Sequence, residues 1–159
     1  MQYIIRQATI NDLKDIQSLN LLLFKKEQKE YDITLNTERT YSEKGTDYFS
    51  HAITNEDDCV VVAEETESHA CIGYLCGIPK KKNPCRTLDA IVELDNMFVS
   101  DVYRSQGIGG ALVEKFKERA KTKGIQRIRV SVSAQNKKAL SFYSKHGLVQ
   151  YDEILEMDI

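Results

Sequence analysis

The hydrophobic positions of this chain change their period several times, and each change marks a predicted element. Apolar residues alternate or run together in segments typical of strands, at residues 2–8, 58–65, 70–78, 93–99 and 127–133. They recur every three or four positions in segments typical of helices, which follow Thr9, run from Thr37 to about Thr54, extend from Gly107 to Gly124 and run from Asn136 to Gly147. The last segment, residues 148–159, has room for one or two closing strands.

Helices and strands in this order predict an α/β fold with a mixed sheet. The strands at residues 58–65 and 70–78 are separated by a short polar turn, which predicts a hairpin. The chain of 159 residues contains no repeat, low-complexity tract or interdomain linker. It is therefore expected to form a single domain over residues 1–159.

Composition narrows the range of partners. The net charge is −2, and charged residues of both signs are interspersed, so neither nucleic acid nor an anionic membrane surface is an expected partner. No apolar stretch approaches transmembrane length and the N-terminus lacks a signal-peptide core, which predicts a cytoplasmic protein. The cysteines lack C-x-x-C spacing, which predicts reduced thiols and no metal site. They are Cys59, Cys71, Cys76 and Cys85.

An apolar strand runs into a glycine-rich turn that opens an amphipathic helix. The first N–H groups of a helix lack partners within it and the helix dipole is positive there, so this junction is predicted to bind phosphate. Gly107, Gly109 and Gly110 have no β-carbon to keep a phosphate from these N–H groups. Ala111 and Leu112 follow, where a P-loop would have Lys and Ser or Thr and a dinucleotide fold would have a third Gly.

The remaining pattern, Arg104-x-x-Gly107-x-Gly109 after a strand, resembles the acyl-CoA motif of the GNAT superfamily of N-acyltransferases. That motif reads Gln or Arg, two residues, Gly, one residue, and Gly or Ala. A later segment resembles the second coenzyme A segment of this family through Asn136, Ala139, Phe142 and Tyr143. The resemblance runs from about Tyr3 to the C-terminus, although residues 24–55 carry no family motif.

The resemblance implies a GNAT-like fold and acetyl-CoA as co-substrate. A central mixed, mostly antiparallel sheet of six to seven strands would be flanked by about four helices. Its fourth and fifth strands would splay apart, so that pantetheine pairs with the free edge of the fourth. The residues implied to bind acetyl-CoA are Met97, Phe98, Val99, Arg104, Ser105, Gln106, Gly107, Ile108, Gly109, Gly110, Asn136, Lys138, Ala139 and Tyr143.

Acetyl transfer to an amine requires a base, donors for an oxyanion and an acid for the leaving thiolate. Glu93 lies where the resemblance places the base of some members, and Asp95 shares its face of the strand because side chains alternate. Glu93, Asp95 and water remain alternative bases. Tyr143 matches the position of the general acid of the family. A main-chain N–H of residues 97–99 is expected to hold the oxyanion.

These expectations predict an N-acetyltransferase that works by direct attack within a ternary complex, with a small primary amine as acceptor. One alternative is an enzyme that acetylates protein N-termini or lysines. Another is a non-catalytic acyl-CoA-binding regulatory protein. A homodimer is left open, since members of the family often dimerise. No signature identifies the acceptor, because the segment expected to form its wall, residues 24–55, has no motif.

Overall fold

The computed structural model describes residues 2–81, 83–88, 90–157 and 159, and it confirms the α/β fold. Its strands are β1 (Tyr3–Gln7), β2 (Cys59–Glu65), β3 (Cys71–Lys80), β4 (Ile91–Val99) and β5 (Arg127–Val130). Its α-helices are α1 (Leu13–Glu30), α2 (Glu43–Thr54), α3 (Ile108–Thr122) and α4 (Lys137–Lys145). Short 3₁₀ helices lie at Ile10–Asp12, Thr37–Tyr41 and Asp101–Tyr103.

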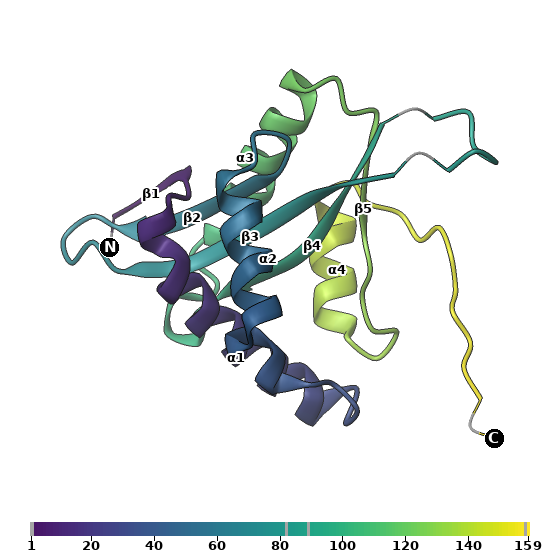
Figure 1. Ribbon diagram of the computed structural model, residues 1–159, viewed down its shortest axis with the longest axis horizontal. Coiled ribbons are helices and arrows are strands. Elements are labelled where there is room, and N and C mark those ends of the chain that lie inside the picture. The colour runs from purple at the N-terminus through teal and green to yellow at the C-terminus, as the bar shows by residue number, and fades with distance from the viewer. Residues whose placement is uncertain (1, 82, 89, 158) are drawn as a thin grey trace.

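The strands form one sheet in the order β1-β2-β3-β4-β5. Neighbouring strands are antiparallel except β4 and β5, which are parallel. Strand β5 pairs only with Ile91–Leu94, and the two strands then diverge (Figure 1). This divergence confirms the predicted splay and leaves one edge of β4 beyond Leu94 unpaired among the described residues.

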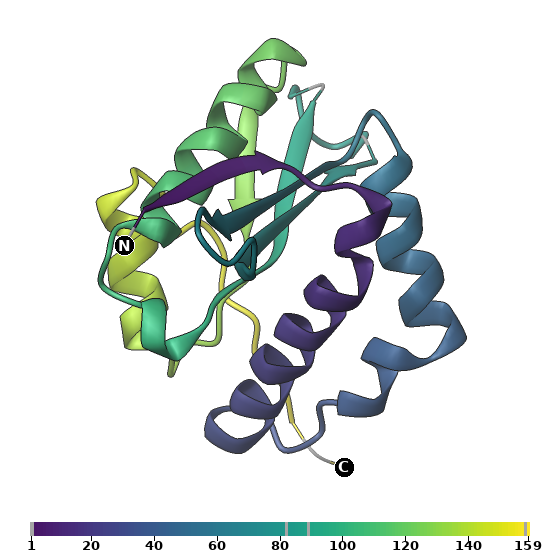
Figure 2. The ribbon, with the colours of Figure 1, turned by 90° about the vertical axis from the view of Figure 1, so that its left-hand side faces the viewer.

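Two layers of helices enclose the sheet. Helices α3 and α4 cover one face, and α1 and α2 cover the other (Figure 2). On the first face, Leu112 and Phe116 of α3 pack against Leu94 of β4. On the second, Ile16 of α1 packs in a separate core with Phe98 of β4. Strand β4 therefore contributes to both cores and lies between the two layers.

Strand β4 contains a bulge near its middle. Gly77 of β3 lies opposite Leu94 and Cys76 lies opposite Asn96, so Asp95 is an extra residue with no partner across the strand pair. A bulge interrupts the alternation of side chains and redirects those beside it. Here both Asp95 and Asn96 are directed toward α2, where their side chains bond to the same residue.

The predicted start of the second helix is wrong. Thr37 opens a 3₁₀ turn, and α2 begins only after Ser42, whose Oγ accepts a hydrogen bond from the Gly45 N–H at 3.1 Å. A β-carbon at Gly45 would lie 2.0 Å from the carbonyl oxygen of Arg39. Ser42 has φ −65° and ψ 163°, an extended conformation that separates the turn from the helix.

The expected closing strands are not found. Residues 148–157 form no strand, and the chain runs away from the sheet (Figure 1), so the described sheet has five strands rather than six or seven. Leu155 is 91% exposed and Met157 is 84% exposed. A segment with alternating apolar residues becomes a strand only when it pairs with another strand, and no described strand pairs with residues 148–157. Strand β5 also ends at Val130, three residues before its predicted end.

Candidate functional site

The turn after β4 presents main-chain N–H groups at the start of α3. Gly107, the N-cap of α3, has φ +85°, and Ser105 has φ +62°. Left-handed residues close together in a turn direct successive N–H groups into one concavity. The N–H groups of residues 105–110 have no acceptor in the described part of the chain. Such a cradle, combined with the helix dipole, fits a phosphate group.

Gly109 and Gly110 have a packing role that the sequence interpretation did not include. A β-carbon at Gly109 would lie 3.4 Å from the ring of Phe142, and one at Gly110 would lie 3.2 Å from the ring of His146. Both rings belong to the α4 region, so the two glycines let this segment approach the start of α3. The same residues therefore shape the turn and position the helix that carries Tyr143.

Arg104 is partly engaged within the turn. Its Nε donates to the carbonyl oxygen of Val99 at 3.0 Å, its Nη2 lies 2.6 Å from Asp101, and its guanidinium stacks on the ring of Phe98 at 5.0 Å. These contacts hold the turn against the end of β4. The side chains of Phe98 and Ile108 are buried in the two cores, so only their main-chain groups are available to a ligand.

Helix α4 begins as predicted at Asn136. Its side chain accepts a hydrogen bond from the Ala139 N–H at 3.0 Å, so Asn136 caps the helix. Tyr143 is half-buried beside the core under α3. Burial, and then the negative charge of Glu27 on α1, raise the pKa of the Tyr143 phenol above its ordinary value. The phenol is therefore protonated at neutral pH and can donate a hydrogen bond. Lys138 is exposed on α4.

Glu93 is buried and both its oxygens are bonded. Its Oε2 lies 2.5 Å from the Lys80 Nζ, and its Oε1 accepts a hydrogen bond from the Ser131 Oγ at 3.1 Å. Lys80 and Ser131 therefore fix the position of the Glu93 carboxylate. Each carboxylate oxygen has a second lone pair, which could still accept a proton.

Asp95 has a more open environment. Its Oδ2 accepts hydrogen bonds from the Tyr48 Oη at 2.6 Å and from the Asn96 Nδ2 at 2.8 Å. Burial is the main cause that raises the pKa of Tyr48. The phenol therefore stays protonated and donates a hydrogen bond to the carboxylate. Burial also raises the pKa of the neighbouring Cys76 thiol to about 12, which makes a thiolate nucleophile unfavourable there.

A cavity of about 170 Å³ lies against this group, between β4 and the two helices α1 and α2. Its lining includes Phe24, Tyr48, Asp95 and Asn96. The Oδ1 of Asn96 is buried and has no hydrogen-bond partner in the described structure. A buried acceptor without a donor is costly, so a ligand donor at this point would be stabilising.

The structure brings most of the predicted residues to one region. Met97, Val99 and Tyr143 pack against the same core, beside the start of α3. Glu93 and Asp95 lie two positions apart on β4 but line different cavities. Sequence reasoning did not identify Tyr48 as a site residue. Its only signal was an inward position on the second helix, which is equally typical of a core residue.

Two other partners were also missed. Asn96 carries the unpaired acceptor, and its direction depends on a bulge that leaves no mark in the hydrophobic pattern. Lys80 lies 13 positions before Glu93 and meets it only because β3 and β4 pair. No group of three or more His, Cys, Asp or Glu side chains in the described ranges is arranged to hold a metal ion. Nor is any described helix long and apolar enough to cross a membrane.

Comparisons with known proteins relate this chain to acetyltransferases. The sequence model of the acetyltransferase (GNAT) family matches residues 22–148. An uncharacterised N-acetyltransferase of Methanocaldococcus jannaschii is 26% identical over 159 aligned residues, which cover 96% of this chain and 63% of that protein. The chain therefore spans less than two thirds of that relative. Thialysine N-epsilon-acetyltransferase of Mus musculus is 26% identical over 149 residues, covering 90% of this chain and 82% of the mouse protein.

Solved structures share the fold. The aminoglycoside N-acetyltransferase AAC(6')-Iy, whose structure was determined in complex with CoA, has a TM-score of 0.77 and 15% identity. The comparison covers 99% of this chain and 95% of that one.

Proposed function

The chain belongs to the GNAT acetyltransferase family, and from this premise we propose that it transfers the acetyl group of acetyl-CoA to the primary amine of a small molecule. The observation that carries the choice of acceptor is the cavity beside Asp95. It offers the exposed carboxylate of Asp95 beside the amide of Asn96, and an ammonium group has three N–H donors. The donors of the amine can therefore bond to the Asp95 carboxylate.

The co-substrate would bind from the side of α3 and α4. The N–H groups of residues 105–110 are placed to hold its diphosphate, and the unpaired edge of β4 offers main-chain groups to its pantetheine amides. A thioester lying along that edge would reach the bulge at Asp95. The acceptor would then approach from the side of α1 and α2, because the cavity opens there.

The amine must lose a proton before it attacks. A free alkyl ammonium with a pKa near ~10.4 is neutral in about one molecule in 2,500 at pH 7. Asp95 would bind the ammonium form and accept its proton directly or through water. Glu93, with its oxygens bonded to Lys80 and Ser131, would act as a positioning residue for the neighbouring strand segment.

Transfer then forms one bond and breaks another. The amine nitrogen bonds to the carbonyl carbon, the carbon–sulfur bond breaks, and the sulfur leaves with the electron pair of that bond. The nitrogen, positively charged after it has formed the bond, loses a second proton to water, and this proton replaces the one that the sulfur takes up. A thiol of this kind has a pKa near ~8.5, so a phenol can stabilise the departing sulfur by hydrogen bonding and supply a proton. Tyr143 is protonated and lies on α4, which packs against the glycine turn, and both facts support this role.

The size of the cavity favours a small acceptor over a folded polypeptide. A volume of about 170 Å³ corresponds to about six water molecules at roughly 30 Å³ each. It fits an amine with a short alkyl chain. Enzymes that acetylate protein chains need a longer groove along which the peptide backbone can lie.

An acceptor screen tests the proposal. The purified chain is incubated with acetyl-CoA and a panel of amines and peptides, and free thiol and acetylated product are measured. We expect turnover with small amines and a loss of about 10²-fold or more in kcat for Tyr143→Phe. The acetyl-CoA affinity of that variant should be nearly kept, because only the phenol oxygen is removed. The control Tyr41→Phe removes an exposed phenol and should leave kcat unchanged.

The outcomes separate the alternatives. Acetyl-CoA binding without thiol release from any acceptor would favour the regulatory protein. Product on peptides alone would favour the protein acetyltransferase. Absence of acetyl-CoA binding at millimolar concentration would refute the whole proposal. The homodimer stays a prediction, which sedimentation of the purified chain would check.

A further inference from the structure

A second and larger cavity lies where β3 ends and β4 begins. Its volume is about 410 Å³. Its described lining includes Lys80, Lys81, Arg86, Glu93 and Arg129, from the β3–β4 hairpin and from β5. Four of these side chains are cationic and one is anionic. The whole chain carries a net charge of −2, so the positive charge here is a local concentration and not an average property.

Most of this positive charge has no carboxylate partner among the residues that the structure describes. Lys80 pairs with Glu93 at 2.5 Å. No carboxylate within the described ranges lies within 4.0 Å of the charged groups of Lys81, Arg86 or Arg129. Arg86 instead stacks over the ring of Tyr151 at 4.7 Å, which orients its guanidinium without neutralising it. Unpaired cations around one cavity repel one another, and an oxyanion between them would remove that repulsion.

The cavity and the amine site both lie along β4. Glu93 lines the cavity with the cations, here called the cationic cavity, and Asp95 lines the cavity beside Tyr48 and Asn96, here called the amine cavity. Two residues of a strand span about 7 Å. Ile91, at the far side of the cationic cavity, lies four residues from Asp95, or about 13 Å along the strand. A small molecule with an amine at one end can therefore reach the cations with its other end.

We propose that the acceptor is an amine that also carries an oxyanion, a carboxylate or a phosphate, and that Arg129 and Arg86 of the cationic cavity bind this group. The inference rests on the proposed function and specifies its substrate class. The separation of the two cavities requires a spacer of several atoms between the amine and the oxyanion. Arginine suits this role, because its planar guanidinium binds carboxylate and phosphate in a bidentate manner. Polycationic amines would be repelled from the same cavity.

Matched acceptors test the inference. Initial rates are compared for 6-aminohexanoate against hexylamine and 1,6-diaminohexane, and for an aminoalkyl phosphate against the corresponding amino alcohol. We expect kcat/KM to be at least 10-fold higher for the anionic member of each set. The two sets also distinguish a carboxylate site from a phosphate site.

Variants locate the effect. Arg129→Gln is expected to raise the KM for the anionic acceptor about 10-fold, with kcat within a factor of three and with no change in KM for hexylamine. Arg86→Gln should act in the same direction. Lys121→Gln is the control, because Lys121 is an exposed cation in the last turn of α3 and does not line the cavity. Acetyl-CoA affinity, measured by calorimetry, should be equal in all variants.

The contradicting results differ from those for the proposed function. Equal kcat/KM for the anionic and uncharged acceptors, or weaker acetyl-CoA binding by Arg129→Gln with acceptor KM unchanged, would overturn the inference and leave the acetyltransferase proposal intact. A protein that acetylates no amine at all would overturn both. The comparison of acceptors on the unaltered chain decides the question even if a variant is unstable.

Discussion

Two asparagines near the acceptor cavity have opposite hydrogen-bond environments. Asn20 donates to the Tyr74 Oη at 3.0 Å and accepts from the Thr40 Oγ1 at 2.7 Å, so both ends of its amide are satisfied. Asn96 donates to Asp95 but its Oδ1 has no donor in the described structure. The first amide therefore stabilises the fold at both ends, whereas the second keeps an acceptor free for a ligand.

Replacement of each asparagine by leucine should separate stability from function. Asn20→Leu leaves two buried hydroxyls without partners and is expected to destabilise the fold by about 2–4 kcal/mol, since each unsatisfied buried group costs about 1–3 kcal/mol. Asn96→Leu should destabilise less, by about 1–2 kcal/mol, and should raise the KM for the amine. Urea unfolding and steady-state kinetics measure the two effects. A larger loss of stability in Asn96→Leu would contradict this assignment.

Gly107 and Gly124 offer a matched pair of left-handed glycines. Their φ values are +85° and +69°, and a β-carbon would meet only the Tyr3 Oη, at 3.6 Å, or nothing within 4 Å. Alanine at either position is expected to cost about 1–2 kcal/mol in backbone strain. Only Gly107→Ala should also weaken acetyl-CoA binding, because Gly107 lies within the proposed phosphate cradle of residues 105–110. Equal acetyl-CoA affinity in the two variants, measured by calorimetry, would argue against the cradle.

At the scale of the elements, predictions succeeded where the signal lies within a few neighbouring residues. The cap at Asn136 is such a case, because an Asn side chain bonds to an N–H three residues later. The end of α2 near Thr54 was also predicted correctly. These features depend on contacts between residues close in the sequence, so they can be predicted from the sequence alone.

Predictions failed where a distant segment decides the structure. The bulge at Asp95 depends on the register of β3, and an extra residue does not disturb an apolar run. The alternation in residues 148–159 would form a strand only beside a partner edge. The ion pair that occupies Glu93 likewise requires two strands to meet, so the candidate site could be located from sequence but its hydrogen bonds could not.

The cap of α4 should affect both stability and catalysis. Asn136→Ala removes the acceptor for the Ala139 N–H and is expected to cost about 0.5–2 kcal/mol. Because α4 carries Tyr143, fraying of its first turn should also lower kcat. Asn136→Ser keeps a capping oxygen and serves as the control, with stability and kcat near those of the unaltered chain. Thermal unfolding and turnover measurements check the pair, and an Asn136→Ala variant as stable as Asn136→Ser would contradict the role of the cap.

At the scale of the whole molecule, β4 lies between the two sides on which we propose that the ligands bind. The α3–α4 layer carries the glycine turn proposed for the co-substrate, and the α1–α2 layer lines the cavity proposed for the amine. Strands β4 and β5 diverge between these two sides. The proposed reaction therefore requires that the α1–α2 layer keeps its position on the sheet.

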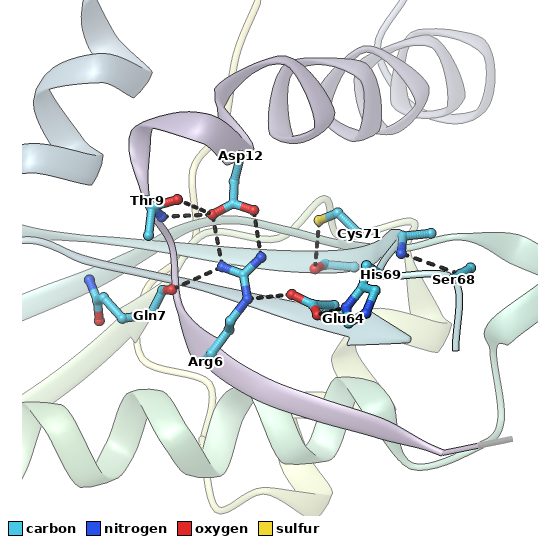
Figure 3. A network of polar contacts seen from close by, with 10 residues as sticks. Arg6, Gln7, Thr9, Asp12, Glu64, Ser68, His69 and Cys71 are labelled. Carbon is cyan, nitrogen blue, oxygen red and sulfur yellow. Dashed lines mark hydrogen bonds and ion pairs between the residues drawn. The ribbon is translucent and has the colours of Figure 1, made fainter. Parts of the chain in front are cut away.

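An ion-pair network joins this layer to the sheet (Figure 3). Arg6 of β1 donates to both carboxylate oxygens of Asp12 before α1, at 2.9 and 2.8 Å, and its Nε lies 2.5 Å from the Glu64 Oε2 of β2. His69 contacts the other oxygen of Glu64 at 2.7 Å. The bonds from Arg6, together with those from Thr9, lower the pKa of Asp12, and His69 and then Arg6 lower the pKa of Glu64.

These shifts predict a loss of stability in acid. A carboxylate whose pKa is lower in the folded state stabilises the fold above its unfolded pKa, which is about 3.9 for Asp and about 4.3 for Glu. That contribution is lost as the pH falls through the folded pKa values. The free energy of unfolding is therefore expected to be steady from pH 7 to about pH 5 and to decrease below about pH 4.

Asp12→Asn isolates the contribution of one carboxylate. At pH 7 it should destabilise the fold by about 1.5–3 kcal/mol, the range for hydrogen bonds to charged groups. The difference from the unaltered chain should shrink as the pH falls, because protonation removes the same charge from Asp12. Urea unfolding at pH 7, 5, 4 and 3 measures this, with Asp152→Asn in the exposed C-terminal segment as the control. A difference that stays constant down to pH 3 would show that Asp12 acts through packing rather than through its charge.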